Sequence, residues 1–184
     1  MIKSNDILYS ACYVLGSVIR EEWDFLYNQA TELHDFPEYY LEVGSHSGGS
    51  ITALAARLAR TNSTKRVISV DNASYPEVSR KKFRENMDNV GLSPWIEEEN
   101  ISSLDYETSL KFSLIFLDGD HSYDCVKEEL IKFDEHLVLN GVFCGHDYQN
   151  YRGLQTAVDN FFTGNDRYET IVCPKNMWAR RRIK

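Results

Sequence analysis

The 184-residue sequence has no excess of basic residues, and this absence excludes a large class of functions. Asp and Glu number 28 against 20 Lys and Arg, so the formal net charge is −8. Because a protein that binds the phosphate backbone needs a basic face, we expect no nucleic-acid partner. The short basic segment 179–184 is either a solvated chain end or a local contact for an anion.

Long apolar runs and paired cysteines are missing as well. No stretch is long and apolar enough to span a bilayer, and the apolar centre of residues 1–25 lacks a convincing cleavage site. The four cysteines are scattered without the spacing of metal or redox motifs: Cys12, Cys125, Cys144 and Cys173. These absences predict a cytoplasmic protein with reduced cysteines and no membrane partner.

What the sequence does contain is an alternation of short apolar runs with longer amphipathic ones. Expected strands cover residues 39–43, 66–70, 93–99, 113–117, 141–145 and 168–173. Expected helices cover residues 49–60, 77–90, 122–137 and 154–162, with Val138–Gly141 closing the third as a glycine C-cap. Apolar strands separated by helices are typical of a mainly parallel sheet covered on both faces.

The end of the chain predicts a different connection. Residues 176–182 follow the strand at 168–173 closely enough to form an antiparallel hairpin at the sheet edge. We therefore predict one α/β domain over residues 1–184, with a Rossmann-like core from 38 to 184 and a seven-stranded sheet. Residues 1–37 form an N-terminal helical cap, which either roofs the site or supplies a homodimer interface.

Ligands bind open α/β sheets beyond the carboxyl ends of the strands, so we expect the functional residues just after each apolar run. The loop LEVGSHSGGS, residues 41–50, carries glycines that allow a sharp turn and close approach to a ligand. It does not give the dinucleotide pattern GxGxxG, and no GK[ST] follows for a P-loop. Asp71 ends the second strand, where a carboxylate either binds both ribose hydroxyls or caps the next helix.

The motif ExGxxxGxS, from Glu42 to Ser50, resembles the first motif of class I S-adenosylmethionine-dependent methyltransferases. Within that superfamily the chain is most similar to the macrocin-type sugar O-methyltransferases, which share phrases like DGDHSY and HDY. The resemblance covers residues 39–162, and it accounts for the terminal hairpin. It implies S-adenosylmethionine as cofactor and a small hydroxylated acceptor, sugar-like or phenolic.

The resemblance also implies the cofactor contacts. Gly44 and Gly48 would lie against the methionine portion, Asp71 would bind the ribose, and Ile101 with Ser102 would reach the adenine. The remaining members of the implied set are Glu42, Ser45, Ser50, Asn72 and Asp118.

Two acidic segments follow the fourth and fifth expected strands. Asp118 ends one, and His146 and Asp147 end the other. Because adjacent strands lie about 5 Å apart, these groups should converge. Such a set either binds a divalent cation, Mg²⁺ or Mn²⁺, or forms a metal-free polar site, and His146 could instead support the ligands or cap a turn.

His121 lies three residues beyond Asp118. In the resembling enzymes this position carries the general base, and an imidazole suits removal of a hydroxyl proton near neutral pH. The alternative is a histidine at the start of a helix that hydrogen-bonds Asp120. Two other functions stay open: a nicotinamide-dependent oxidoreductase on a similar sheet, and a methyltransferase-like binding domain without catalysis.

Overall fold

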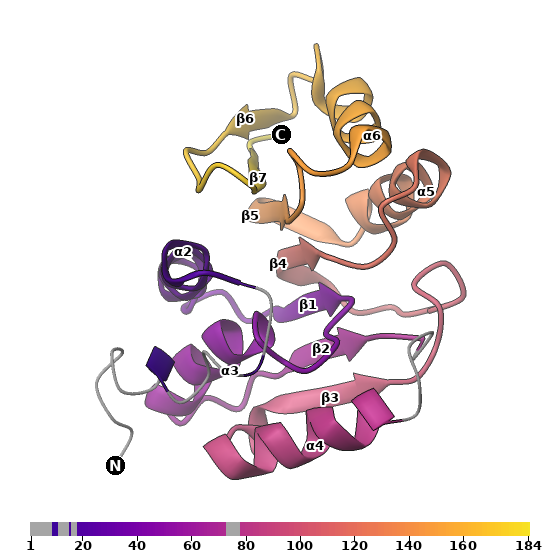
Figure 1. Cartoon of the computed structure of the whole chain (residues 1–184). Coiled ribbons are helices and arrows are strands. Elements are labelled where there is room, and N and C mark those ends of the chain that lie inside the picture. Colours follow the sequence, from indigo (N-terminus) through magenta and orange to yellow (C-terminus); the bar gives the residue numbers. More distant parts are fainter. Residues whose placement is uncertain (1–8, 11–14, 16–17, 73–77) are drawn as a thin grey trace.

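The computed structural model describes residues 9–10, 15, 18–72 and 78–184, and within them seven strands form one sheet (Figure 1). The order is β3-β2-β1-β4-β5-β7-β6. The strands are β1 Tyr39–Val43, β2 Val67–Val70, β3 Ile96–Glu99, β4 Phe112–Leu117, β5 Leu137–Gly145, β6 Tyr168–Thr170 and β7 Trp178–Arg182. The first five are parallel, whereas β7 is antiparallel to both β5 and β6. This confirms the predicted Rossmann-like sheet with its C-terminal antiparallel hairpin.

Helices cover both faces of the sheet, as the apolar strands predict (Figure 1). One face carries α2 Arg20–Glu32, α3 Ile51–Arg60 and α4 Val78–Val90, and the other carries α5 Tyr123–Asp134 and α6 Arg152–Phe162. Successive residues of β4 serve the two faces: Leu114 and Phe116 join the first core, Ile115 and Leu117 the second. Burial of each such side chain stabilises the fold by about 1.5–3 kcal/mol, which explains why central strands have no polar side.

One predicted helix end is wrong. The helix α5 ends at Asp134, and the segment expected to cap it lies inside β5. Asn140 has a left-handed φ of 63°, and the pairing of β4 with β5 shifts register there. Asn tolerates this conformation, so the Asn-Gly pair marks a bulge in a long strand.

Two predicted strands are shorter than expected. Pro94 lies in a short 3-10 helix, Ser93–Trp95, so β3 begins only at Ile96. Proline cannot donate to a strand ladder, which explains the delayed start. The strand β6 ends at Thr170, and the chain then turns toward β7.

The described part of the N-terminal cap packs on the sheet face beside α3. Trp23 donates its indole N–H to Thr52 Oγ1 at 2.9 Å, and Tyr40 donates its hydroxyl to the Ala30 carbonyl at 2.8 Å. Leu15 is also described, and it is buried in the same core. The rest of the predicted cap falls on residues 1–8, 11–14 and 16–17, outside the described residues.

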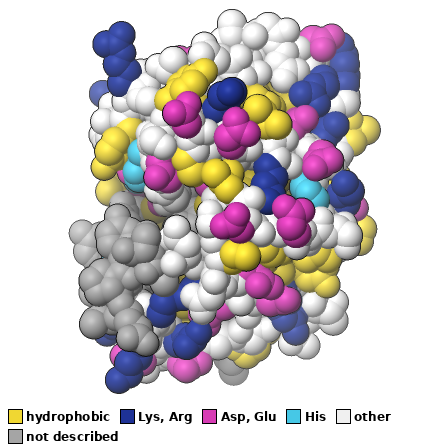
Figure 2. Space-filling view, turned by 90° about the vertical axis from the view of Figure 1, so that its right-hand side faces the viewer, with side chains coloured by type: hydrophobic (Ala, Val, Ile, Leu, Met, Phe, Trp, Pro, Cys, Tyr) yellow, Lys and Arg dark blue, Asp and Glu magenta, His cyan; other side chains and the backbone are white. Residues whose placement is uncertain are grey.

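The sheet reverses its order between β1 and β4. The chain runs outward from β1 to β2 and β3 and then returns to place β4 on the other side of β1. Loops leaving the carboxyl ends of these two strands therefore diverge and leave a crevice. Acidic and basic side chains are interspersed on the face shown in Figure 2. No described helix is sufficiently long and apolar to span a membrane.

Candidate active site

The glycine loop begins at the point where β1 touches the end of β4. Gly44 has φ +84°, and a Cβ placed there would lie 2.2 Å from the Asp118 carbonyl oxygen. No other residue fits without moving one of the two strand ends. Gly48 has φ +96°, but its missing side chain makes room for Met87 of α4. The two motif glycines therefore have different structural roles. Gly44 lets the loop lie against the end of β4 at the crevice, and Gly48 lets the loop pack against α4.

Hydrogen bonds from neighbouring strands hold the loop in place. The Asp71 carboxylate accepts the backbone N–H of His46 at 3.0 Å, and Ser45 Oγ lies 2.7 Å from Ser69 Oγ. His46 has a left-handed φ of 43°, a conformation that this contact helps to maintain. The carboxylate of Asp71 thus contacts the glycine loop.

Glu42 is buried beneath the loop. Its Oε1 accepts a hydrogen bond from the Ser50 hydroxyl at 2.7 Å, while Oε2 has no hydrogen-bond partner among the described residues. Burial raises the pKa of Glu42 well above its ordinary value. The residue supports the loop from below and does not line the cavity.

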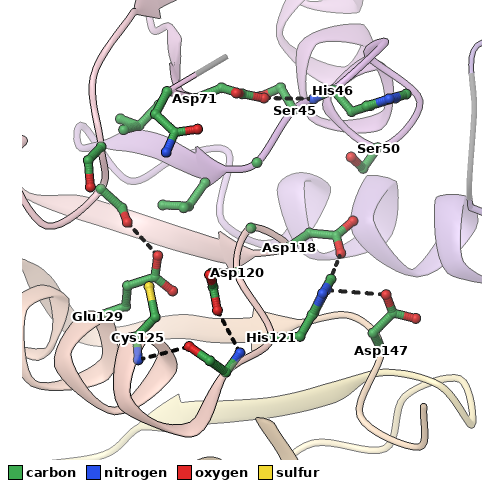
Figure 3. A pocket seen from close by; sticks show the side chains of 18 of the residues that line it. Ser45, His46, Ser50, Asp71, Asp118, Asp120, His121, Cys125, Glu129 and Asp147 are labelled. Carbon is green, nitrogen blue, oxygen red and sulfur yellow. Dashed lines mark hydrogen bonds and ion pairs between the residues drawn. The ribbon is translucent and has the colours of Figure 1, made fainter. Parts of the chain in front are cut away.

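At the other end of the crevice His121 faces two carboxylates (Figure 3). Its Nε2 lies 3.3 Å from Asp147 Oδ2 and 3.8 Å from Asp118 Oδ1. The imidazole also stacks on Tyr151, with ring centroids 4.2 Å apart. Potential ligand atoms of Asp118, His121 and Asp147 all lie within 4.8 Å of one another.

Asp147 is held firmly in this cluster. It has a left-handed φ of 58°, rare for a non-glycine residue. Its Oδ1 accepts hydrogen bonds from Asn150 at 2.6 Å and from Asn176 at 3.1 Å, which leaves Oδ2 toward His121. Such strained and fully supported positions are typical of functional sites.

His146 occupies the buried side of the same carboxylates. Its Nε2 lies 3.1 Å from Glu22 Oε2 of α2, and its Nδ1 lies 3.5 Å from Asp147 and 3.7 Å from Asp118. Both members of the Glu22 pair are buried. The ring therefore joins the N-terminal helix to the two acids and does not line the cavity.

The cluster shifts the affinity of its members for protons. Burial raises the pKa of Asp118, and the Asp118 carboxylate in turn raises the pKa of His121. Burial lowers the pKa of His146, but Glu22, Asp118 and Asp147 together raise it overall. The site thus favours positive charge between its carboxylates, carried either by a protonated histidine or by a cation.

These groups surround a cavity of about 920 Å³, a size at which small-molecule sites are found. One end has His121, Asp147 and Tyr151; the other has Ser103, Cys125 and Glu129. Of the predicted residues, the cavity is lined by Gly44, Ser45, Ser50, Asp71, Asn72, Ser102, Asp118, His121 and Asp147. Glu42, Gly48, Ile101 and His146 lie outside the lining.

Sequence reasoning missed several residues of the site. Glu129 occupies a buried position on α5, between Val126 and Leu130, and an acid within an apolar helix face was a visible indication. Glu22 lies on another helix and Asn176 precedes β7, and nothing in their local sequence connects them with the cluster. Tyr151 follows the second acidic segment, where an aromatic side chain is as compatible with ordinary packing as with a cavity wall.

Comparison with protein families gives the class. A family model described as a methyltransferase domain matches residues 41–148, more than half of the chain. The chain therefore belongs to this methyltransferase family, which confirms the resemblance seen in the glycine loop. No curated protein matches the sequence significantly.

Solved structures of methyltransferases share the fold. The O-methyltransferase NovP is 14% identical with a TM-score of 0.78, over 89% of this chain and 80% of that one. An O-methyltransferase from Bacillus cereus in complex with SAH is 18% identical, TM-score 0.70, over 100% and 93%. CalS11, a TDP-rhamnose 3'-O-methyltransferase, is 15% identical, TM-score 0.66, over 98% and 96%.

Proposed function

We propose that this methyltransferase transfers the methyl group of S-adenosylmethionine to a hydroxyl oxygen of a small molecule, sugar-like or phenolic. The observation that carries the proposal is the arrangement of the cavity. Asp71 lies on its wall beside the glycine loop, and the cluster of Asp118, His121 and Asp147 lies at one end. The cofactor fits these residues, because Asp71 lines the cavity and offers a carboxylate to ribose hydroxyls. O-methyltransferases among the structural neighbours support oxygen as the acceptor atom.

The chemistry follows from the cluster. When bound, S-adenosylmethionine would supply an electrophilic methyl group, whose bond to the positively charged sulfur breaks on transfer and leaves neutral S-adenosylhomocysteine. His121 lies at the cavity wall and can take the proton of an acceptor hydroxyl as that oxygen attacks the methyl carbon. Asp147 and Asp118 hold the imidazole in place and stabilise the imidazolium that forms.

We further propose that Asp118, His121 and Asp147 can hold a divalent cation. Their ligand atoms are close enough together, and His121 Nε2 is buried without a well-aligned hydrogen-bond partner among the described residues. A cation there would occupy His121 Nε2, so in the metal-loaded site the cation would replace the imidazole as the group that promotes loss of the hydroxyl proton, by lowering the pKa of the bound hydroxyl. The mixed oxygen and nitrogen set suits Mn²⁺ at least as well as Mg²⁺. His146, predicted as a ligand, is replaced by His121 in this proposal.

The acidic chain argues for a small molecule in preference to nucleic acid. The face in Figure 2 mixes charges of both signs, whereas a phosphate-backbone binder needs a continuous basic surface.

Thermal unfolding with S-adenosylhomocysteine, with NAD as the comparison ligand, tests the cofactor. At 100 times its dissociation constant a ligand should add about 2.7 kcal/mol to the free energy of unfolding, which raises Tm clearly. A shift with S-adenosylhomocysteine alone supports the proposal. A shift with NAD alone would establish an oxidoreductase, and no shift with either ligand at millimolar concentration would contradict cofactor binding.

The metal is tested separately on the active enzyme. Dialysis against a chelator should abolish turnover, and Mn²⁺ or Mg²⁺ should restore it; an Asp147→Asn variant should need more metal for the same recovery. Full turnover in chelator would refute the metal and leave the methyl transfer standing.

A further inference from the structure

A buried acid that methyl transfer does not need lies at the end of the cavity away from His121. Glu129 is 1% exposed, on the face of α5 that also buries Val126 and Leu130, yet its carboxyl group lines the cavity (Figure 3). Ser103, from the loop after β3, donates its hydroxyl to Oε1 at 2.5 Å. Oε2 has no hydrogen-bond partner among the described residues, and the Cys125 thiol, which also interacts with the carboxyl group, is only a weak donor.

Such a carboxyl group would be unfavourable as a purely structural element. A buried acid without a cation loses its hydration, and no described Lys or Arg is paired with it. Burial raises the pKa of Glu129 to about 7; the Ser103 hydrogen bond, Cys125 and His121 oppose this shift, and Asp120 adds to it. At neutral pH a large share of Glu129 is therefore a neutral acid, with one donor and one acceptor.

The position of Glu129 in the cavity indicates what it would meet. Asp71 lies on the wall between the two ends, and the reacting group must lie near His121. A nucleoside whose ribose is bound by Asp71 and whose sulfur points toward His121 directs its base to the end formed by Ser102, Ser103 and Glu129. Adenine presents there a donor, its 6-amino group, beside an acceptor, N1.

We propose that Glu129, held by Ser103, recognises the amino edge of the adenine ring and so determines the base specificity of the cofactor site. The inference rests on the proposed function, because adenine reaches this cavity only as part of the cofactor. The acid O–H donates to N1 and the carbonyl oxygen accepts from the 6-amino group, a two-point pairing like the one that a glutamine side chain makes with N6 and N7 of adenine. Ser103 is a positioning residue, because its hydroxyl acts through Glu129.

The test is the dissociation constant of S-adenosylhomocysteine, measured by titration calorimetry on four proteins. Glu129→Gln keeps a donor and an acceptor and should bind within about threefold of the wild type. Glu129→Leu keeps the volume without polar atoms and should bind ten- to a hundredfold more weakly. Glu128→Gln makes the same chemical change at the exposed neighbouring residue and should have no effect.

Two further readouts separate recognition from packing. Wild-type affinity should fall as pH rises through about 7, as Glu129 loses its proton, while Glu129→Gln should stay flat over the same range. An N6,N6-dimethyl analogue of S-adenosylhomocysteine cannot donate from its amino group, so the wild type should discriminate against it and Glu129→Ala should not. Thermal unfolding without ligand verifies that each variant is folded. If Glu129→Leu fails to fold, the pH dependence of Glu129→Gln and the discrimination against the dimethyl analogue still test the inference.

Equal affinity of the wild type and Glu129→Leu, with unchanged discrimination in Glu129→Ala, would overturn the inference and leave the proposed function intact. A wild-type protein that does not bind S-adenosylhomocysteine at all would instead overturn the proposed function, and the inference with it.

Discussion

Two histidines flank the same pair of carboxylates, and the direction of each ring decides its role. His121 contacts Asp118 and Asp147 from the cavity side, whereas His146 contacts them from the core side and reaches Glu22. Residue positions after strand ends predicted that Asp118, His146 and Asp147 would converge, and His146 Nδ1 lies 3.7 Å from Asp118 and 3.5 Å from Asp147. They could not predict which histidine faces the solvent, because that depends on side-chain directions that only packing determines.

A substitution at His121 tests its role as the base. His121→Gln should lower kcat by about 10²- to 10⁴-fold, the usual contribution of a general base, with unchanged affinity for S-adenosylhomocysteine. Wild-type turnover should rise with pH to a midpoint above 6.5, because the neighbouring carboxylate raises the pKa of His121 and the base must be unprotonated. Steady-state kinetics and ligand titration measure both quantities.

His34 offers the matched control for this variant. It lies just before β1, at the opposite edge of the sheet from the cavity, so His34→Gln should leave kcat unchanged. If His121→Gln keeps the wild-type kcat and pH profile, another group removes the proton.

At the scale of elements, the sequence predicted the strands well and their ends less well. Apolar runs located the central strands β1, β2, β4 and β5, because a strand buried on both faces has few polar residues. The Asn140–Gly141 pair was misassigned to a helix end, because glycine after asparagine serves a C-cap and a strand bulge equally. Pairing with β4 decides between the two, and pairing between distant segments is not visible in local sequence.

The contribution of other elements to the site was also beyond the local sequence. Glu22 of α2 accepts the backbone N–H of Ile19 at 3.0 Å, which is a helix-capping contact, and the same Oε2 lies beside His146. The cap explains why a glutamate lies three residues after Ile19, the N-cap of the helix. Its contact with His146 exists only because α2 packs against the sheet, and this makes the N-terminal helix part of the support of the site.

At the scale of the whole molecule, the carboxyl edge of the sheet gathers buried acids whose proton affinity is raised. Burial raises the pKa of Glu129 to about 7 and that of Glu42 further above its ordinary value. The folded state therefore binds more protons than the unfolded state between about pH 4.5 and pH 7. By linkage, the stability from these groups is present at lower pH and is lost as pH rises through their folded pKa values.

We therefore expect the chelator-treated, ligand-free protein to lose stability between pH 5.8 and pH 7.5. Glu129 alone should remove about 1.5 kcal/mol over this range, a fall in Tm of about 3–6 °C for a domain of this size. Groups with lowered pKa values act the other way: Lys65 falls only to about 8, above the range, whereas burial lowers the pKa of the partly buried His34, whose share opposes the trend. Thermal or urea unfolding in buffers of constant ionic strength measures the effect. Glu129→Gln should reduce the loss of stability between these pH values by the amount that Glu129 contributes, whereas Glu128→Gln should not change it. Stability that rises across this range in the wild type would show that the buried acids are already ionised in the folded protein, and the assignment of Glu129 as a neutral acid would fall with it.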